Sequence, residues 1–484
     1  MKFEPVIGLE VHAQLSTESK IFCGCSTRFG AEPNTQTCPV CLGMPGVLPV
    51  TNKKVIEYAV RMAFAVHCKM NTHSILARKN YFYPDLPKGY QISQYEEPLA
   101  EKGWVKIGEE EKETRKIRIL RIHIEEDAGK SVHDEAYVEA DESMMDFNRC
   151  GTPLIEIVSQ PDLRTPKEAF LYLTQLRQLV RWLGICDGNM EEGSLRCDAN
   201  ISLRPTGEKK LGVKTELKNM NSIKGVEKAL EVEIQRQTEI LQKGGEVIQQ
   251  TLLWDEDRQT VLPMRGKEEA HDYRYFPDPD LIPIELTEDQ VEGIRNALPE
   301  LPEACRKRWI RTFSLPAYDA GVLSEDRAIA EYFEKLVALV DDPKQAANWV
   351  MGEVLRRLKE RDLDISELSV QPAQLSELIK IIQDEQISHT AGKRVFEEWM
   401  QSSESLDQIV ERLGLKQVSD QSALEKLVHT VLQENPKEVQ KYLDGHDKIF
   451  GFLMGKIMQA SRGKANPKRA NDLLRQKLTE LQDE

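Results

Sequence analysis

Ile7-Gly-Leu-Glu-Val-His-Ala-Gln-Leu15 alternates apolar and polar residues over its whole length. The odd positions are apolar, and the even positions hold Gly8, Glu10, His12 and Gln14. Because successive side chains of a β-strand point to opposite faces, the alternation predicts a strand with one buried and one polar face.

Two later segments show the same alternation. In residues 120–125 we expect one face to be buried and the other to be polar, with the buried residues being Leu120, Ile122 and Ile124, and the polar ones Arg121, His123 and Glu125. In residues 195–204 the expected inward residues are Leu195, Cys197, Ala199, Ile201 and Leu203, and the outward ones are Arg196, Asp198, Asn200 and Ser202. Three strands therefore present carboxylates on a polar face.

Glu156 interrupts the apolar run Leu154-Ile-Glu-Ile-Val158, where a plain strand would have Val or Ile. Burying a carboxylate costs several kcal/mol unless a cation compensates it. A Mg²⁺ ion would do so, and its candidate ligands are Glu10, His12, Glu125, Glu156 and Asp198. The alternative for each strand is the solvated side of a half-buried sheet, but such faces are ordinarily rich in Lys, Thr and Ser.

Basic residues lie near these segments, among them Arg78 and Lys214 and the three candidate phosphate ligands Lys79, Lys88 and Lys218. The chain contains no Gly-x-x-x-x-Gly-Lys-Ser/Thr and no Gly-x-Gly-x-x-Gly motif. A bound nucleotide would therefore depend on metal and scattered cations on a sheet. The alternative for any one lysine is a solvated surface residue.

Cys23, Cys25, Cys38 and Cys41 form two close pairs in Gly- and Pro-rich sequence. Four thiolates with this spacing fit a closed tetrahedral Zn²⁺ site, whose role would be structural. The alternatives are four free thiols or a Cys38-Pro-Val-Cys41 redox pair, which lacks the βαβ context of redox motifs. The other five cysteines, at 68, 150, 186, 197 and 305, look like isolated buried residues.

From Leu286 onward, amphipathic helical patterns follow one another, for example in residues 328–340 and 375–386. We predict an α+β class with three domains: a sheet domain over 1–292, a helical domain over 293–410 and a small helical tail over 411–484, after a break at 414–419. The formal net charge is −15, yet residues 448–477 hold eight Lys and Arg against one Asp. That tail has the charge expected for contact with a phosphate backbone.

Composition excludes fibrous and largely disordered classes, with 40% hydrophobic and 30% charged residues in 484. The first residues show no secretory signal pattern, and the uncharged stretch 33–52 contains prolines and polar residues that do not suit a membrane helix. We expect a cytoplasmic protein without a membrane association.

Several of these segments resemble one family. They are Ile7–Leu15, the four cysteines, Tyr81–Gln91, Ile122–Gly129, Asp146–Glu156, Arg196–Asn200, Glu216–Asn221, Tyr273–Pro279 and Gly451–Lys456. In this order they look like the GatB family, the B subunits of bacterial tRNA-dependent amidotransferases, and the last segment resembles the YqeY-like tail of that family.

The resemblance implies a cradle domain similar to the antiparallel sheet of glutamine synthetase. It also implies a kinase role: ATP phosphorylates the side chain of Glu-tRNA(Gln), and in many bacteria of Asp-tRNA(Asn), and ammonia then displaces the phosphate. Ammonia would come from an amidase-like partner (GatA) in a heterotrimer with GatC, since no Ser-Ser-Lys amidase signature occurs here. By the same resemblance, Glu10, His12, Glu125, Glu156 and Asp198 take the family's metal-bearing positions, and some members lack the four cysteines.

Two other functions remain open from the sequence. One is a self-sufficient ATP-dependent carboxylate–amine ligase acting on a small molecule, for which the basic tail has no use. The other is a Zn-stabilised RNA-binding scaffold, which leaves the inward carboxylate at position 156 unexplained.

Overall fold

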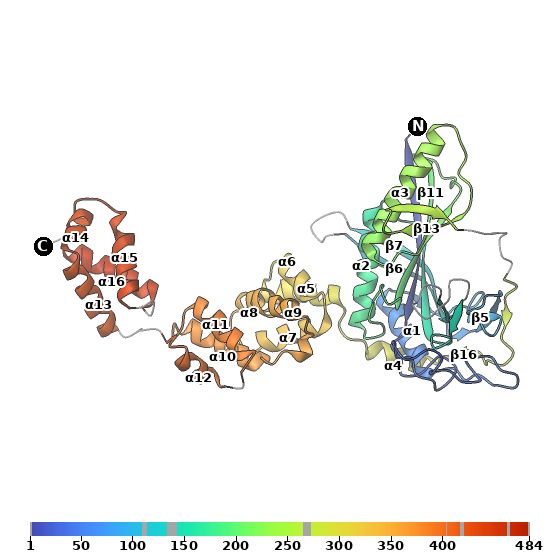
Figure 1. Ribbon diagram of the computed structural model, residues 1–484, viewed down its shortest axis with the longest axis horizontal. Helices are drawn as coiled ribbons and strands as arrows, with labels where there is room; N and C mark the ends of the chain where they lie inside the picture. Colours follow the sequence, from blue (N-terminus) through green and yellow to red (C-terminus); the bar gives the residue numbers. More distant parts are fainter. Residues whose placement is uncertain are drawn as a thin grey trace. The chain divides into compact units, whose positions relative to one another are not determined.

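The computed structural model describes residues 2–108, 114–132, 143–264, 273–402, 404–416, 421–461 and 465–482. The chain divides into two compact units, Met1–Cys305 and Arg306–Glu484. Figure 1 shows that the first unit contains the sheets and the second is helical. Within the described residues, no helix is both long and apolar enough to span a bilayer.

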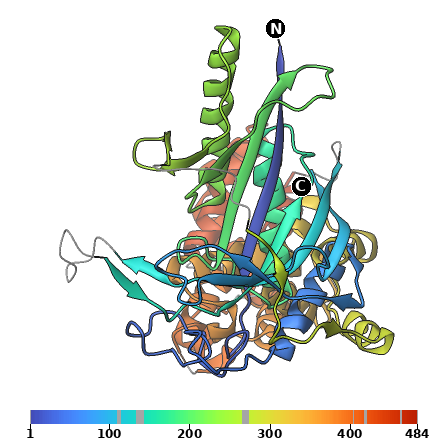
Figure 2. The ribbon, with the colours of Figure 1, turned by 90° about the vertical axis from the view of Figure 1, so that its right-hand side faces the viewer.

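A nine-stranded sheet organises the first unit. Its strands, in spatial order, are β14 (Thr260–Pro263), β13 (Thr251–Asp255), β12 (Thr215–Lys218), β11 (Leu195–Pro205), β1 (Phe3–Gln14), β10 (Pro153–Ser159), β7 (Arg115–Glu126), β6 (Ala100–Ile107) and β2 (Lys69–Met70). All neighbouring pairs are antiparallel except β12 and β13. The long strands β1 and β11 run side by side through the middle of the sheet (Figure 2).

Smaller sheets flank the large one. They comprise β15 (Phe276–Pro277), β4 (Ala77–Asn80) and β5 (Tyr90–Ser93); β16 (Ile284–Glu285) and β3 (His73–Ser74); and β8 (Lys130–Val132) and β9 (Met144–Asp146). Among them β5 matters most for the site below, because two of its side chains hydrogen-bond to the carboxylate of Glu125 at the end of β7.

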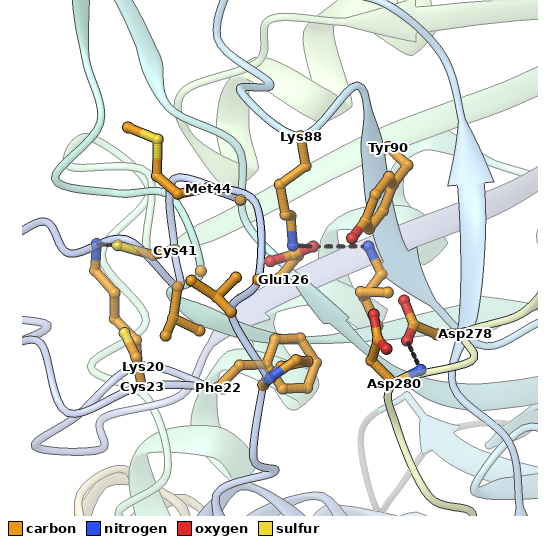
Figure 3. Close-up of a pocket in the computed structure, with 17 residues that line it drawn as sticks. Lys20, Phe22, Cys23, Cys41, Met44, Lys88, Tyr90, Glu126, Asp278 and Asp280 are labelled. Atoms are coloured by element: carbon orange, nitrogen blue, oxygen red, sulfur yellow. Dashed lines mark hydrogen bonds and ion pairs between the residues drawn. The ribbon is translucent and has the colours of Figure 1, made fainter.

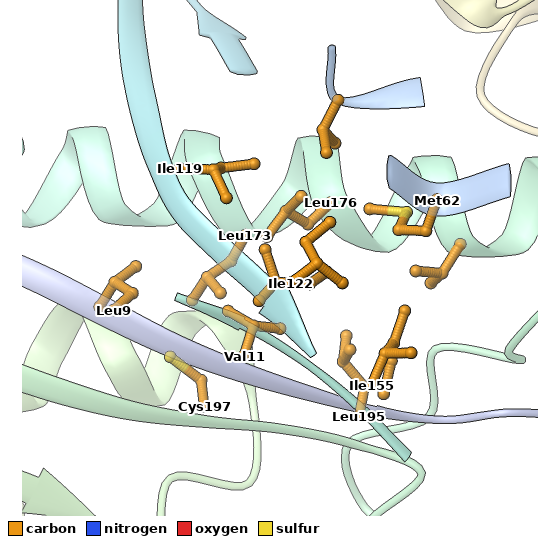
Figure 4. Close-up of a cluster of buried hydrophobic side chains, with 14 of the residues drawn as sticks. Leu9, Val11, Met62, Ile119, Ile122, Ile155, Leu173, Leu176, Leu195 and Cys197 are labelled. Atoms are coloured by element: carbon orange, nitrogen blue, oxygen red, sulfur yellow. The ribbon is translucent and has the colours of Figure 1, made fainter. Parts of the chain in front are cut away.

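Three helices cover the apolar face of the large sheet: α1 (Lys53–Ala65), α2 (Pro166–Trp182) and α3 (Ile223–Gln242). Thr165 and Ser222 begin α2 and α3 as side-chain N-caps. Figure 4 shows strand residues such as Val11, Ile122 and Ile155 packed against Leu173 and Leu176 of α2. One face of the sheet therefore packs in the hydrophobic core, and the opposite face carries the polar side chains.

The alternation predicted for β1 and β11 is confirmed. Every residue expected to face inward in the two strands is buried, namely Ile7, Leu9, Val11, Ala13 and Leu15 in or just after β1, and Leu195, Cys197, Ala199, Ile201 and Leu203 in β11. The other five cysteines are buried, as expected, and form no disulfide bond in the described part of the chain.

The expectation for Leu120 is wrong, because this side chain is 43% exposed. The pairing of β10 with β7 skips one residue here, since Val158 faces Arg121 while Ser159 faces Ile119. This bulge inserts an extra residue and changes which side faces the core. Ile117 and Ile119 are buried before it, and Ile122 and Ile124 after it.

Helix α4 (Glu288–Asn296) is the last helix that lies wholly in the first unit. The boundary between Cys305 and Arg306 falls within α5 (Pro302–Phe313). The second unit continues with α6 (Ala317–Leu323), α7 (Arg327–Val337), α8 (Pro343–Trp349), a π-helical turn (Val350–Val354), α9 (Leu355–Arg361), a 3₁₀ turn (Ile365–Glu367), α10 (Pro372–Gln383), α11 (His389–Trp399) and α12 (Leu406–Arg412). The helices expected in 328–340 and 375–386 are therefore present as α7 and α10.

The tail contains α13 (Gln421–Glu434), α14 (Pro436–Leu443), α15 (Ile449–Ala460) and α16 (Pro467–Glu480). They pack around a small core that includes Leu424, Val428, Leu453, Ile457 and Leu474. Gly414 ends the preceding helical region with a positive φ, as the predicted break requires, although residues 417–419 of that break lie outside the described residues. The division into three domains stays a prediction.

Candidate active site

The register of three neighbouring strands brings polar side chains together on the open face of the sheet. His12 of β1 lies opposite Glu156 of β10, which in turn lies opposite His123 of β7. Neighbouring strands are about 4.8 Å apart, so these side chains form a row across the sheet. Glu125 lies two residues beyond His123 on the same face of β7.

The row is closely connected. Glu156 Oε2 lies 3.3 Å from His12 Nε2 and 3.1 Å from His123 Nε2, and His123 Nε2 is also 3.1 Å from Glu125 Oε1. One ligand atom from each of His12, Glu125 and Glu156 lies within 4.8 Å of the others. We call these three residues and His123 the acidic cluster.

Strand β5 holds Glu125 from the side. Ser93 Oγ donates a hydrogen bond to Glu125 Oε1 at 2.6 Å, and Gln91 Nε2 donates one to Oε2 at 3.3 Å. Because both oxygens have fixed donors, the carboxylate has a defined orientation before any ligand arrives.

Charge in the acidic cluster is balanced by its histidines. Burial raises the pKa of Glu156, but the charge of His123 and the hydrogen bond with His12 outweigh it and hold the pKa well below its ordinary value. Burial lowers the pKa of His123, but the charge of Glu156 and the hydrogen bond with Glu125 outweigh it and raise the pKa to about 9. Burial and the charge of Glu156 raise the pKa of Glu125, but the hydrogen bond and charge of His123 outweigh them, so that this pKa is also lowered. Both carboxylates are therefore ionised, and ionised carboxylate oxygens are the ligands that a divalent cation prefers.

Glu10 and Asp198 continue the polar face beside the cluster. Asn200 Nδ2 donates a hydrogen bond to Glu10 Oε1 at 2.9 Å, and Lys218 Nζ lies 3.2 Å from Asp198 Oδ2. Burial raises the pKa of Glu10, and the charges of Glu156 and Asp198 raise it further. These two predicted ligands thus lie on the same polar face as the acidic cluster, but Glu10 is hydrogen-bonded to Asn200 and Asp198 is paired with Lys218.

The three candidate phosphate lysines are placed differently. Lys79 lies over the rings of Tyr81 and Tyr273, and although burial lowers its pKa, the charge of Glu125 raises it above the ordinary value. Lys218 joins Asp198 to Glu216 at the other side of the cluster.

Lys88 is ion-paired with buried Glu126 and lies over Tyr90. Lys88 lines a separate cavity with a volume of about 180 Å³. Asp278 and Asp280 also line this cavity (Figure 3). The cation of Lys88 is therefore committed to a neighbouring carboxylate, unlike that of Lys79.

Sequence reasoning identified His123 as a polar-face residue but did not include it among the candidate site residues. It touches both carboxylates of the cluster. Its position two residues before Glu125 was the available signal, since residues i and i+2 of a strand share a face.

Asp127 anchors the end of the polar face. Its Oδ2 accepts hydrogen bonds from Gln14 Nε2 at 2.7 Å and from Arg196 Nη2 at 2.9 Å, and Arg149 Nε lies 3.6 Å away. Burial raises the pKa of Asp127, but the charges of Arg196 and Arg149 outweigh it and lower the pKa. The ion pairs join β7, β11 and the 147–152 turn.

We expect Asp127→Ala to lower the free energy of unfolding by about 3 kcal/mol, because two arginines lose their buried partner. Urea unfolding followed by tryptophan fluorescence measures the effect. Asp257→Ala, at an exposed carboxylate, is the control and should leave the transition unchanged. Equal transitions for the two variants would contradict a structural role for this ion network.

The four cysteines predicted to bind zinc converge. One sulfur from each of Cys23, Cys25, Cys38 and Cys41 lies within 4.8 Å of the others, and all four thiols are free. The hydrogen bond with Cys23 lowers the pKa of Cys41 to about 5, which favours the metal-binding thiolate there, while the hydrogen bond with Cys41 raises the pKa of Cys23 and burial raises that of Cys25 to about 11. The fully buried Lys20 places Nζ 3.7 Å from Cys41 Sγ, where its charge offsets that of the thiolates. This donor set fits a tetrahedral Zn²⁺ site.

Comparison with known proteins identifies the family. Residues 5–292 match the GatB/GatE catalytic domain, and residues 331–478 match the GatB domain named for YqeY. The chain belongs to the GatB family. The first match contains the whole acidic cluster and the four cysteines, and the second contains most of the helical unit.

Two relatives show how far the GatB likeness extends. The B subunit of the aspartyl/glutamyl-tRNA(Asn/Gln) amidotransferase of Thermodesulfovibrio yellowstonii is 55% identical over 474 residues, covering 98% of this chain and 99% of the relative. The protein of the same name from Chlorobaculum tepidum is 54% identical over 478 residues, covering 99% of this chain and all of the relative. The family resemblance read from the motifs is therefore confirmed.

Proposed function

We propose that this chain is the B subunit of a tRNA-dependent amidotransferase and that its acidic cluster is the kinase site. The side-chain carboxylate of Glu-tRNA(Gln), or of Asp-tRNA(Asn), attacks the γ-phosphorus of ATP, and ADP leaves. Ammonia then attacks the acyl carbon of the mixed anhydride and phosphate leaves. The amide product is Gln-tRNA(Gln) or Asn-tRNA(Asn).

The convergence of His12, Glu125 and Glu156 carries this proposal. Phosphoryl transfer requires mainly the positioning of the reacting groups and the neutralisation of their charge. Two buried, ionised carboxylates would form a binding site for Mg²⁺. In the proposal Glu125 and Glu156 are its first ligands, and His12, Glu10 and Asp198 are the further candidates. Bound Mg²⁺ would neutralise charge on the transferring phosphoryl group.

The cations beside the cluster would act on the nucleotide. Of the three candidate lysines, Lys79 is the most available to bind phosphate, because it lies over two tyrosine rings and, within the described residues, is not held by a carboxylate as Lys88 and Lys218 are. Lys218 could reach phosphate while it holds Asp198, and Lys88 would first have to leave Glu126.

The ammonia source lies outside this chain in the proposal. The glutaminase GatA would supply ammonia, and GatC would complete the heterotrimer, in a cytoplasmic assembly. A small-molecule ligase would not need the helical tail, and a scaffold would not need two carboxylates buried against histidines.

Reconstitution tests the function as a whole. The purified chain, combined with its amidase-type and C-type partners, should amidate Glu-tRNA(Gln) with ATP, Mg²⁺ and glutamine. A parallel assay with Asp-tRNA(Asn) decides whether both substrates are used. ATP-independent amidation, or amidation without this chain, would contradict the kinase assignment.

The tail is proposed as the tRNA-binding part. Its basic residues include Lys448, Lys456 and Lys468, while Arg462 and Lys464 lie outside the described residues. Deleting residues 411–484 should weaken tRNA binding. It should also make the negative slope of log K against log salt shallower, by about 0.7–0.9 for each phosphate that the tail neutralises. The measurement is filter binding over a salt series with the full complex. An unchanged slope would contradict the assignment.

A further inference from the structure

One cavity connects the four cysteines with the acidic cluster. Cys23 and Cys41 line the same cavity of about 180 Å³ as Lys88 (Figure 3). Glu126 lines it too, and in the chain it directly follows Glu125 of the acidic cluster. The residues around this cavity therefore stand between the predicted zinc site and the predicted kinase site.

A tight turn carries Cys38 and Cys41 and packs on Lys88. We call it the cysteine turn, residues 38–44, and backbone hydrogen bonds within it close it. Gly43 has a φ of +65°, and a Cβ at this position would lie 2.3 Å from Cγ of Lys88. Any side chain there would collide with the lysine, so glycine lets the turn lie directly against the lysine stem.

Both cysteine pairs have a neighbour in contact with Lys88. Its Nζ lies 5.8 Å from the centre of the Phe22 ring, and Phe22 directly precedes Cys23. The same Nζ is ion-paired with Glu126, and the two side chains are only 10% and 3% exposed. Because the lysine is packed on several sides, a shift of the cysteine segment would move its cation relative to Glu126.

Glu126 in turn fixes strand β5. Its Oε1 accepts a hydrogen bond from Ile92 N at 2.8 Å, and its carbonyl oxygen accepts one from Gln91 Nε2 at 2.8 Å. Gln91 and Ser93 are the β5 residues that hold the carboxylate of Glu125. The side chain and the backbone of Glu126 therefore both support the donors that orient Glu125.

A second path joins the cysteine segment to β7 through the backbone. Ile21 N donates to the carbonyl oxygen of Gly151 at 2.9 Å, and Gly151 N donates to that of Asp127 at 3.0 Å. These bonds anchor the start of the cysteine segment beside the end of β7. Among the described residues, the cysteine turn itself makes no hydrogen bond to β7. Lys88 therefore links the turn to that strand.

We propose that Lys88 and Glu126 are positioning residues that make the orientation of Glu125 depend on the cysteine turn. This inference rests on the proposed kinase function and deepens it. When metal binding fixes the turn, its glycine packs on Lys88 and the ion pair holds Glu126 in place. Strand β5 then keeps its two donors on Glu125. When the turn loosens, the ion pair loosens and Glu125 loses its defined orientation. Lys88 thus acts through Glu126 and does not bind phosphate.

Kinetics of the reconstituted complex test this role. Lys88→Met removes the charge but keeps an unbranched stem beside Gly43. It should lower kcat for tRNA-stimulated ATP hydrolysis about tenfold and leave the KM for ATP within about twofold, because a misoriented Glu125 weakens transition-state stabilisation without removing a phosphate ligand. Lys88→Arg keeps the charge and should recover most of kcat. Lys106→Met, which breaks a lysine–glutamate pair with Glu303 on β6, is the matched control and should change neither constant.

Zinc removal separates the coupling from a local effect of the substitution. Treatment with a zinc-selective chelator, with Mg²⁺ restored, should lower kcat of the wild-type complex about tenfold, and elemental analysis measures the zinc that is lost. In Lys88→Met the same treatment should lower kcat by less than about twofold, because the contact that transmits the change is already broken.

Hydrogen exchange supplies a measurement that does not depend on turnover. The Ile92 amide donates to Glu126, so it reports whether that carboxylate stays in place. It should exchange about tenfold faster in Lys88→Met and in the zinc-free wild type than in the zinc-bound wild type. In Lys106→Met it should exchange at the wild-type rate.

A raised KM for ATP with a normal kcat in Lys88→Met would make Lys88 a phosphate ligand and overturn the positioning role. Equal losses of kcat on zinc removal in the variant and the wild type would overturn the coupling. The kinase function stands in both cases. A wild-type complex without tRNA-stimulated ATP hydrolysis would overturn that function as well.

Discussion

Replacing Glu156 with glutamine is expected to lower ATP hydrolysis stimulated by Glu-tRNA about 10²- to 10³-fold or more. The substitution keeps the size of the side chain but removes a charge that contacts both His12 and His123. The loss of one preorganised electrostatic group from an active site typically has an effect of this size. Glu125→Gln should behave similarly, because Ser93 and Gln91 hold that carboxylate in place.

Affinity for tRNA should stay within about tenfold, or 1.4 kcal/mol, since the acidic cluster is not the proposed tRNA-binding surface. Single-turnover measurements with labelled ATP separate the chemical step from binding. Glu233→Gln is the matched control, because Glu233 is fully buried on α3 and hydrogen-bonded to Thr215 and Arg236, away from the open face. Normal turnover in Glu156→Gln would reject the cluster as the kinase site.

Replacing Cys38 or Cys41 with serine is expected to reduce bound zinc from about one ion per chain to none. Structural zinc sites contribute on the order of 10 kcal/mol to the segments they fold. From Leu15 to Asn52 the chain forms turns and one isolated bridge, between Ser19 and Ser26, without a helix or strand. We therefore expect this segment to become sensitive to limited proteolysis in the variants.

Elemental analysis of protein prepared without chelator measures the zinc, and mass spectrometry locates the cleavage. Cys68→Ser is the control, because Cys68 is buried in the main core at a distance in sequence from the four thiols, and the variant should retain zinc. A wild-type chain free of zinc would contradict the site. Zinc retained in both Cys38→Ser and Cys41→Ser would do so as well.

Much of the fold could be predicted because its local patterns are strong. Alternation in β1 and β11 named the buried residues correctly, and helical periodicity located α7 and α10. Leu120 failed because a bulge depends on the pairing of β7 with β10, which no local pattern encodes. Lys88 could not be assigned from sequence either, since it lies in the turn before β5 and its partner Glu126 lies at the distant end of β7.

The sequence by itself determined which residues of β1 and β11 face the core, and which four sulfurs are close enough in sequence to share a metal, since both follow from spacing along one chain. Only the tertiary structure decided that His12, Glu156 and His123 stand in one row and that Asp127 is held by two arginines. These depend on strand order and register, which are set by the packing of whole strands and helices around a common core.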